Sequence, residues 1–221
     1  MNMPLLYWAG QVTGEPRYAE IAHTHAGRLR DTIIRDDDTT FHTFHFDPVT
    51  GAPSHGSTQQ GHADNSCWAR GQAWGIYGFA LNYRHTGDES FLAAARRCAD
   101  YFLNHLPADR VAYWDLVFGD GSGQPRDSSA SAIAACGLLE LTDAAPDIDQ
   151  ADEYREAAAA MVESLAGPYV PASPGPGSPL ITQSVYDMPN LNGVDEGTLW
   201  GNYYYLEAIT RLLRPEWKSW W

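Results

Sequence analysis

The feature that most constrains the fold is a repeated pair of helical segments joined by a Thr-Gly turn. Thr13-Gly14-Glu15 and Thr86-Gly87-Asp88 each follow an apolar or small-residue helical pattern and precede a more amphipathic one. Glycine suits the left-handed position that ends a helix, and an acidic residue suits the first turn of the next helix. The segment 138–162 resembles a third copy. The chain is therefore predicted to consist of helical hairpins in which inner, apolar helices alternate with outer, more polar ones.

Helical periodicity extends over most of the chain. It predicts helices over 4–12, 16–35, 66–85, 89–106, 127–142, 151–166 and 198–213. Alternating hairpins of this type either stack as a solenoid or close into an α/α toroid. Because these segments make about three and a half hairpins, we expect an all-α fold that is either a small open array or part of a larger ring.

Three connecting segments, 36–65, 107–126 and 167–197, are long for a helical domain, and long loops often carry function. Residues 39–48 read as a possible short hairpin. Residues 168–179 are rich in Pro, Gly and Ser, which favours a mobile loop.

The composition excludes some classes of partner. A net charge of −14 argues against nucleic acid, because phosphate contacts need clustered Lys and Arg. No apolar run reaches the length of a membrane span, and the N-terminus lacks the pattern of a signal peptide. Cys67, Cys98 and Cys136 lie in helical patterns without metal-ligand spacing, which indicates reduced core residues and favours a cytoplasmic protein.

The segment around Arg70 is the strongest candidate for a binding site. Trp68 and Trp74 flank this arginine at helical spacing, and small residues surround all three. Flat aromatic faces beside a planar cation suit a ring-shaped ligand that carries a carboxylate. A semi-buried arginine needs an anion, so the alternative is a structural ion pair with Asp64 or Asp115. Ligand contact is the favoured interpretation.

Polar and aromatic residues gather at the predicted starts of the inner helices, which converge on one mouth in a toroid. They are Gln60, His62 and Asp64 before the first, Trp114, Asp115 and Asp127 before the second, and Asp195, Glu196 and Trp200 near the last. Helix capping is the simpler interpretation for Asp127 and Asp195, and the tryptophans could equally serve packing.

Metal binding is not expected, and no cofactor motif is present. His23 and His25 lie two apart on a predicted helix and face different ways, so they are read as surface residues. His42 and His45 lie on opposite faces of a predicted extended segment. The sequence contains no phosphate-binding glycine loop, nucleophile elbow or zinc signature.

Five ordered motifs together resemble the unsaturated glucuronyl hydrolases, glycoside hydrolase family 88. The central one is Ser-Cys-Trp-Ala-Arg-Gly-Gln-Ala-Trp-Gly-Ile-Tyr-Gly-Phe over Ser66–Phe79, and the others are Met1–Ala9, Tyr113–Asp115, Arg126–Ala130 and Gly193–Ala208. A sister group that acts on unsaturated rhamnogalacturonan fragments typically has Arg-Gly-Asn-Gly-Trp. The Arg-Gly-Gln-Ala-Trp found here favours the glucuronyl group, with the rhamnogalacturonyl group as an alternative.

The resemblance implies a six-hairpin α/α toroid that removes 4,5-unsaturated glucuronic acid from oligosaccharides released by polysaccharide lyases. In that reaction an aspartic acid protonates the enol-ether double bond, water adds to the ring, and the resulting hemiketal collapses. The resemblance also implies a sugar pocket, in which Arg70 and His42 hold the uronate and its surroundings, Gln60 forms a hydrogen bond and the tryptophans stack on sugar. The residues carried over are His42, Gln60, Trp68, Arg70, Trp74 and, on a looser match, Tyr186.

The resemblance places the family's catalytic aspartates upstream of the segment that matches Met1. We therefore expect residues 1–221 to be the C-terminal part of a single toroid domain, without a catalytic residue and inactive alone. Exposed hairpin faces should then favour self-association. The rival hypothesis is a non-catalytic, carbohydrate-binding helical-repeat module in which the aromatic residues serve recognition only.

Overall fold

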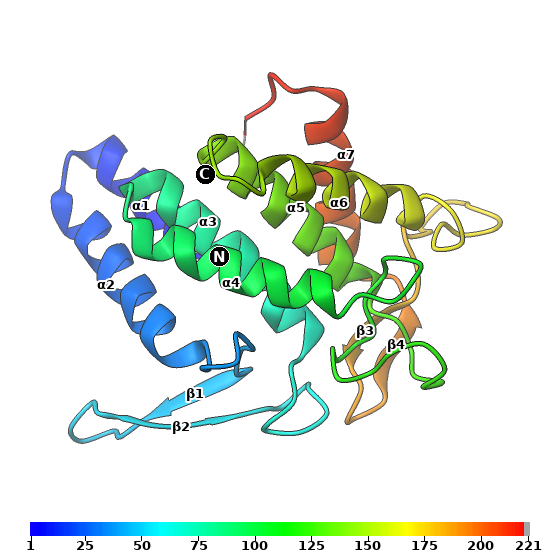
Figure 1. Cartoon of the computed structure of the whole chain (residues 1–221), viewed down its shortest axis with the longest axis horizontal. Coiled ribbons are helices and arrows are strands. Elements are labelled where there is room, and N and C mark those ends of the chain that lie inside the picture. Colours follow the sequence, from blue (N-terminus) through cyan, green and yellow to red (C-terminus); the bar gives the residue numbers. More distant parts are fainter. Residues whose placement is uncertain (219–221) are drawn as a thin grey trace.

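The computed structural model describes residues 1–218, which form an arc of helical hairpins with two small β-hairpins along one edge (Figure 1). The helices are α1 (Met3–Thr13), α2 (Pro16–Ile33), α3 (Ala69–Thr86), α4 (Glu89–Asn104), α5 (Ser128–Ala144), α6 (Ala151–Leu165) and α7 (Leu199–Leu213). The antiparallel strand pairs are β1 (Thr43–Phe46) with β2 (Pro53–Ser57), and β3 (Ser184–Asp187) with β4 (Asn192–Glu196). The predicted all-α architecture and all the predicted helices are confirmed.

The Thr-Gly turns end two of the inner helices as predicted. Gly14 and Gly87 adopt left-handed conformations, with φ of 72° and 67°, and donate their N–H groups to Gly10 and Tyr83. Asp88 then caps α4 by accepting a hydrogen bond from the amide of Ser90. Each turn therefore ends one helix and sets the start of the next within two residues.

Helices α3 and α5 form the centre of the arc, and α4 and α6 cover their outer side (Figure 1). Every residue of α5 from Ser128 to Thr142 is buried, whereas α4 and α6 each bury one face only. The α3 and α5 backbones approach closely, because a Cβ at Gly137 would lie 2.8 Å from the amide nitrogen of Tyr77. This confirms the predicted alternation of inner and outer helices, with α1–α2, α3–α4 and α5–α6 as hairpins and α7 as the half.

A buried charge cluster joins the C-terminal halves of α3, α5 and α7. The carboxylate of Glu140 is fully buried and pairs with Arg84 and Arg211, both at 2.8 Å. Burial raises the pKa of Glu140, although the two arginines act in the opposite direction. Arg211 also contacts Glu207 and the hydroxyl of Tyr77. The cluster fixes three inner helices to one another near their C-terminal ends.

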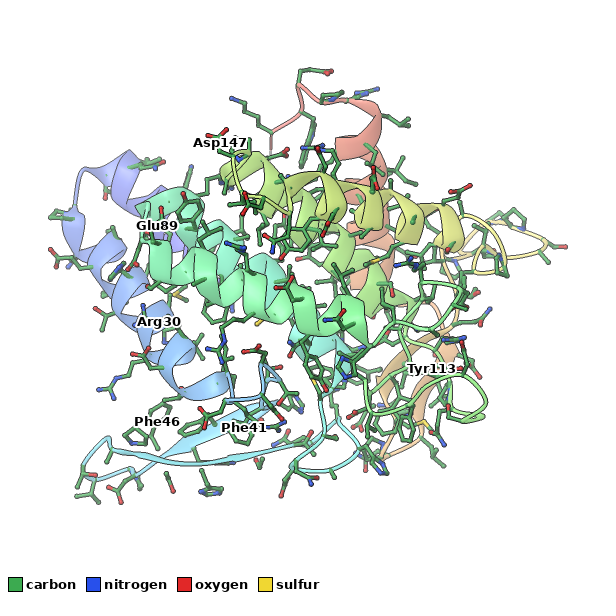
Figure 2. The ribbon with its side chains drawn as sticks, in the orientation of Figure 1. Arg30, Phe41, Phe46, Glu89, Tyr113 and Asp147 are labelled. Carbon is green, nitrogen blue, oxygen red and sulfur yellow. The ribbon has the colours of Figure 1, made fainter. Side chains whose placement is uncertain are left out.

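The two β-hairpins are the part of the fold that the sequence pattern did not predict fully. Strand β1 lies inside the predicted 39–48 hairpin, but its partner β2 lies beyond that range, so the predicted boundaries were wrong. The β3–β4 hairpin falls in the segment 167–197, for which only a loop was expected. Figure 2 shows Phe41 between the end of α2 and the first hairpin, where its ring occupies the space beside Gly56.

No helix within residues 1–218 is long and apolar enough to cross a membrane.

His85, at the end of α3, makes the stability of the chain depend on pH. Its ring stacks on Tyr7 of α1, with centroids 4.8 Å apart. Burial, followed by the nearby charge of Arg84, lowers the pKa of His85 to about 4 from an ordinary 6.5. The unfolded chain therefore binds a proton at His85 below pH 6.5, whereas the folded chain binds it only near pH 4. The contribution of the neutral His85 ring to the free energy of unfolding is complete above pH 6.5 and is lost as the pH falls from 6.5 to about 4.

We therefore expect the free energy of unfolding to be lower near pH 5 than near pH 7.5, and the difference to shrink in a His85→Gln variant. Urea titrations followed by circular dichroism at both pH values would measure this. Replacement of the exposed His55 by Gln serves as the matched control. A pH dependence that His85→Gln leaves unchanged would contradict the assignment.

Candidate functional site

The N-terminal ends of α3, α5 and α7 meet at one mouth, as the toroid prediction requires. Arg70 in the first turn of α3 pairs with Asp127, which precedes α5, at 2.7 Å. The indole Nε1 of Trp200 in α7 donates to the hydroxyl of Ser129 at 3.1 Å. Three segments separated by more than 50 residues are therefore joined by polar side chains at this point.

A cavity of about 630 Å³ runs beside α3 from this mouth. One side is formed by Trp68, Gly71, Trp74, Gly75 and Gly78, since residues three and four apart share a helical face. The other lining residues are Met1, Asn2, Met3, His25, Ala26, Leu29, Ile33, Thr40, Phe41, His42, Phe79, Asn82 and Tyr204. Its volume lies in the range of small-molecule sites.

His42 presents a defined tautomer at the rim of this cavity. Its Nδ1 accepts hydrogen bonds from the amides of Gln59 and Gln60, at 3.0 and 3.1 Å, which leaves the proton of the neutral ring on Nε2. Burial and the charge of Arg70 lower the pKa of His42, while Asp187 acts in the opposite direction. The ring packs against Trp68, with centroids 4.2 Å apart. His42 is thus held as a neutral hydrogen-bond donor.

Arg70 is enclosed by protein groups. Its side chain is 3% exposed, and its Nη1 donates to Asp127 and to the carbonyl of Val185. Its guanidinium lies over the rings of Trp68 and Trp200, at 4.6 and 5.2 Å from their centroids. The ion-pair partner of Arg70 is Asp127, at the start of α5, and not Asp64 or Asp115, the two carboxylates considered from the sequence. Those two side chains accept hydrogen bonds from backbone amides instead.

The predicted residues Gln60 and Arg70 hold strand β3 of the β3–β4 hairpin. The Nε2 of Gln60 and the Nη2 of Arg70 both donate to the carbonyl oxygen of Tyr186, at 2.9 and 2.7 Å. The half-exposed ring of Tyr186 lies 5.6 Å from that of Trp200. These contacts place the hairpin beside the mouth.

The two best-placed carboxylates at the mouth are structural. Asp115 is fully buried and accepts from the amides of His62 and Cys67 and the hydroxyl of Ser66. Asp127 is fully buried and caps α5 through the amide of Ser129, which confirms the capping interpretation. At α7 the cap is Thr198 rather than Asp195. Among the described residues, the side chains that line the cavity include no Asp or Glu.

The six residues predicted for the site therefore lie near one another in two groups. His42, Trp68 and Trp74 line the cavity, whereas Gln60 and Arg70 both donate to the backbone carbonyl of Tyr186 in β3. Sequence reasoning missed Tyr204, whose ring lies 5.3 Å from that of Trp74. Its position one helical turn after Trp200 was the signal that could have found it.

Within residues 1–218 the structure contains no group of three or more His, Cys, Asp or Glu side chains that could hold a metal ion. His23 and His25 are both exposed, and His25 borders the cavity.

Comparisons with known proteins agree on one family. Glycosyl Hydrolase Family 88 matches residues 1–169. The unsaturated chondroitin disaccharide hydrolase of Streptococcus pneumoniae is 48% identical over 222 residues, which cover 100% of this chain and 56% of the relative. The crystal structure of unsaturated glucuronyl hydrolase from Streptococcus agalactiae superposes with a TM-score of 0.96 at 45% identity, covering 100% of this chain and 55% of the other.

A mutant of the Streptococcus agalactiae enzyme complexed with dGlcA-GalNAc6S superposes with a TM-score of 0.91 at 45% identity, covering 100% of this chain and 58% of the other. The chain thus spans little more than half the length of the relatives it matches. The arc of hairpins is therefore a part of the toroid that these structures share.

Proposed function

The chain belongs to glycosyl hydrolase family 88, and we propose that it forms the C-terminal part of a single toroid domain in an unsaturated glucuronyl hydrolase. Such an enzyme removes 4,5-unsaturated glucuronic acid from the non-reducing end of oligosaccharides that lyases have generated. The observation that carries this proposal is the cavity beside α3, where two tryptophans and a neutral histidine donor line a space of about 630 Å³.

The contacts of the described residues support two roles, sugar contact by the residues that line the cavity and positioning by the residues that contact the β3–β4 hairpin. Trp74 offers an aromatic face to a sugar ring, Trp68 lines the same space, and His42 offers its Nε2–H to a ring oxygen or carboxylate. Arg70 has its guanidinium enclosed, so we assign it a positioning role toward Trp68 and the β3–β4 hairpin. Gln60 shares that role through the carbonyl of Tyr186.

The chemistry of the proposed reaction needs a proton donor that the cavity lining does not supply. Protonation of the enol ether lets water add to the ring, and the hemiketal then opens to release the remaining oligosaccharide. Asp115 and Asp127 are fully buried and engaged with backbone amides, so neither can reach a sugar. In this proposal residues 1–221 bind the unsaturated uronate, and the acid comes from the part of the enzyme that the match does not cover.

Titration calorimetry with an unsaturated chondroitin disaccharide tests the binding role. Trp74→Ala should weaken binding by roughly tenfold, because it removes one aromatic wall of the cavity. Trp8→Ala removes an exposed tryptophan of α1 outside the cavity and serves as the matched control. Equal affinities for the unmodified chain and Trp74→Ala would contradict the assignment of the cavity.

The proposal also covers the cellular compartment of the chain and its self-association. The three cysteines are free and buried, which supports a reducing, cytoplasmic compartment, and the relatives named above are bacterial. The exposed apolar side chains of α1 and α7 support weak self-association of the chain when it is studied alone.

A further inference from the structure

The β1–β2 hairpin carries two histidines that stand directly opposite each other. His45 of β1 pairs in register with His55 of β2. Both residues are exposed, and their rings stack with centroids 4.6 Å apart. Spacing along the chain does not reveal this pair, because the two histidines come together only when the strands pair. Neither histidine lines the cavity described above.

The two histidines share the face of the hairpin that points away from the helices. Side chains alternate along a strand, so His45 lies on the face opposite to Phe44 and Phe46. Figure 2 shows Phe46 on the side toward α2, where the guanidinium of Arg28 lies over its ring at 6.0 Å from the centroid. The histidine pair is therefore open to solvent and to dissolved ions.

Each ring uses one nitrogen for a hydrogen bond with a serine hydroxyl. The Nε2 of His45 lies 2.7 Å from the Oγ of Ser57, and the Nδ1 of His55 lies 2.9 Å from the Oγ of Ser54. The other nitrogen of each ring has no hydrogen-bond partner within residues 1–218. A histidine that binds a metal uses its second nitrogen for a hydrogen bond, which fixes the tautomer and the orientation of the ring.

Two imidazole rings at this separation suit a divalent transition-metal ion. Zn²⁺ binds imidazole nitrogen at about 2.0–2.1 Å, so two ligating nitrogens lie at most about 4.2 Å apart. The rings of His45 and His55, 4.6 Å apart, need only a small rotation to reach that separation, and exposed side chains rotate freely. Mg²⁺ and Ca²⁺ prefer oxygen ligands, which the two rings do not offer. The net charge of −14 favours the approach of a cation.

The hairpin that carries this pair is continuous with the rim of the cavity. His42 immediately precedes β1, and its Nδ1 accepts hydrogen bonds from the amides of Gln59 and Gln60, which follow β2. An ion held by one histidine of each strand restrains both strands and, through them, the contacts of His42.

We propose that His45 and His55 bind one divalent transition-metal ion, such as Zn²⁺, and that the ion clamps β1 to β2 beside His42. Water completes the coordination of the ion, because the described residues contain no group of three His, Cys, Asp or Glu side chains that could hold it. The ion has a structural role, since the pair lies outside the cavity lining. This proposal does not depend on the sugar-binding role proposed above.

Isothermal titration calorimetry of residues 1–221 with Zn²⁺, and separately with Mg²⁺, tests the site. We expect one Zn²⁺ per chain and no binding of Mg²⁺. The three cysteine thiols are buried and do not compete for the ion. His45→Gln and His55→Gln should each lower the affinity for Zn²⁺ by at least about tenfold, because each leaves a single protein ligand.

His23→Gln is the matched control. It removes an exposed histidine whose Nε2 lies 3.1 Å from Asp88, which is the competing pair of possible ligands, and it should leave the affinity for Zn²⁺ unchanged. Circular dichroism should show that all three variants are as folded as the unmodified chain, since the replaced side chains are exposed.

Amide hydrogen exchange tests the clamp. Saturating Zn²⁺ should slow exchange of the β1 and β2 amides in the unmodified chain and in His23→Gln, but not in the two hairpin variants. An absence of Zn²⁺ binding up to about 1 mM would overturn the proposal. An affinity that neither hairpin variant lowers would also overturn it, as would hairpin exchange that bound Zn²⁺ leaves unchanged.

Discussion

Replacement of Asp127 by alanine should lower the free energy of unfolding by about 3–5 kcal/mol, because it leaves the guanidinium of Arg70 buried without its counter-ion. Arg70 is 3% exposed and Asp127 is fully buried, so water cannot substitute for the lost carboxylate. The substitution also removes the cap of α5, at the amide of Ser129. Urea unfolding followed by circular dichroism near neutral pH would measure the change.

Two further variants separate this effect from a general sensitivity to charge removal. Asp120→Ala removes a carboxylate that is 57% exposed and paired with Arg126, so it should cost less than about 1 kcal/mol. The double variant Arg70→Met with Asp127→Ala should recover part of the loss, because it leaves no buried charge unpaired. A loss below about 1 kcal/mol for Asp127→Ala alone would show that the pair does not hold the mouth together.

The helices could be predicted from sequence because their signals are local. A Thr-Gly turn encodes both the end of one helix and the start of the next, and Gly14 and Gly87 adopt the conformation that this requires. The order of inner and outer helices followed from the same pattern. Helices α3 and α5 consist largely of apolar and small residues, whereas α4 and α6 have one apolar and one polar face.

The hairpins could be predicted only in part, because apolar alternation marks β1 alone among the four strands. Strand β2 reads Pro-Ser-His-Gly-Ser and is largely exposed. Its position depends on Phe41, whose ring fills the space beside Gly56, and on pairing with β1. The β3–β4 hairpin is placed by Arg70 and Gln60 from distant parts of the chain. Such contacts exist only after folding.

The proximity of the candidate site residues was predictable, but their individual contacts were not. The motif around Trp68, Arg70 and Trp74 pointed to the mouth of the helices, and the structure joins it to His42 and Tyr186. The partner of Arg70 lies 57 residues away, so the nearer carboxylates were the natural but incorrect candidates. What distinguishes a ligand-facing arginine from an enclosed one is burial, and burial depends on the tertiary fold.

The largest expected effect concerns catalysis. Residues 1–221 alone should not hydrolyse an unsaturated glucuronyl disaccharide, although they should bind it. Protonation of the enol ether needs a carboxylic acid within hydrogen-bond reach of the ring. The described residues that line the cavity include no carboxylate, and Asp115 and Asp127 are committed to backbone amides. His42 is held neutral by two amide donors and its pKa is lowered, so it is a poor acid.

The decisive measurement is the ultraviolet absorbance of the unsaturated ring of a chondroitin disaccharide incubated with residues 1–221, beside the full-length Streptococcus pneumoniae relative. We predict that absorbance falls with the relative and stays at the spontaneous rate with the chain alone. A loss of absorbance that depends on the concentration of the chain and disappears in Trp74→Ala would contradict the account, because it would show that these residues bind the sugar and also supply the proton.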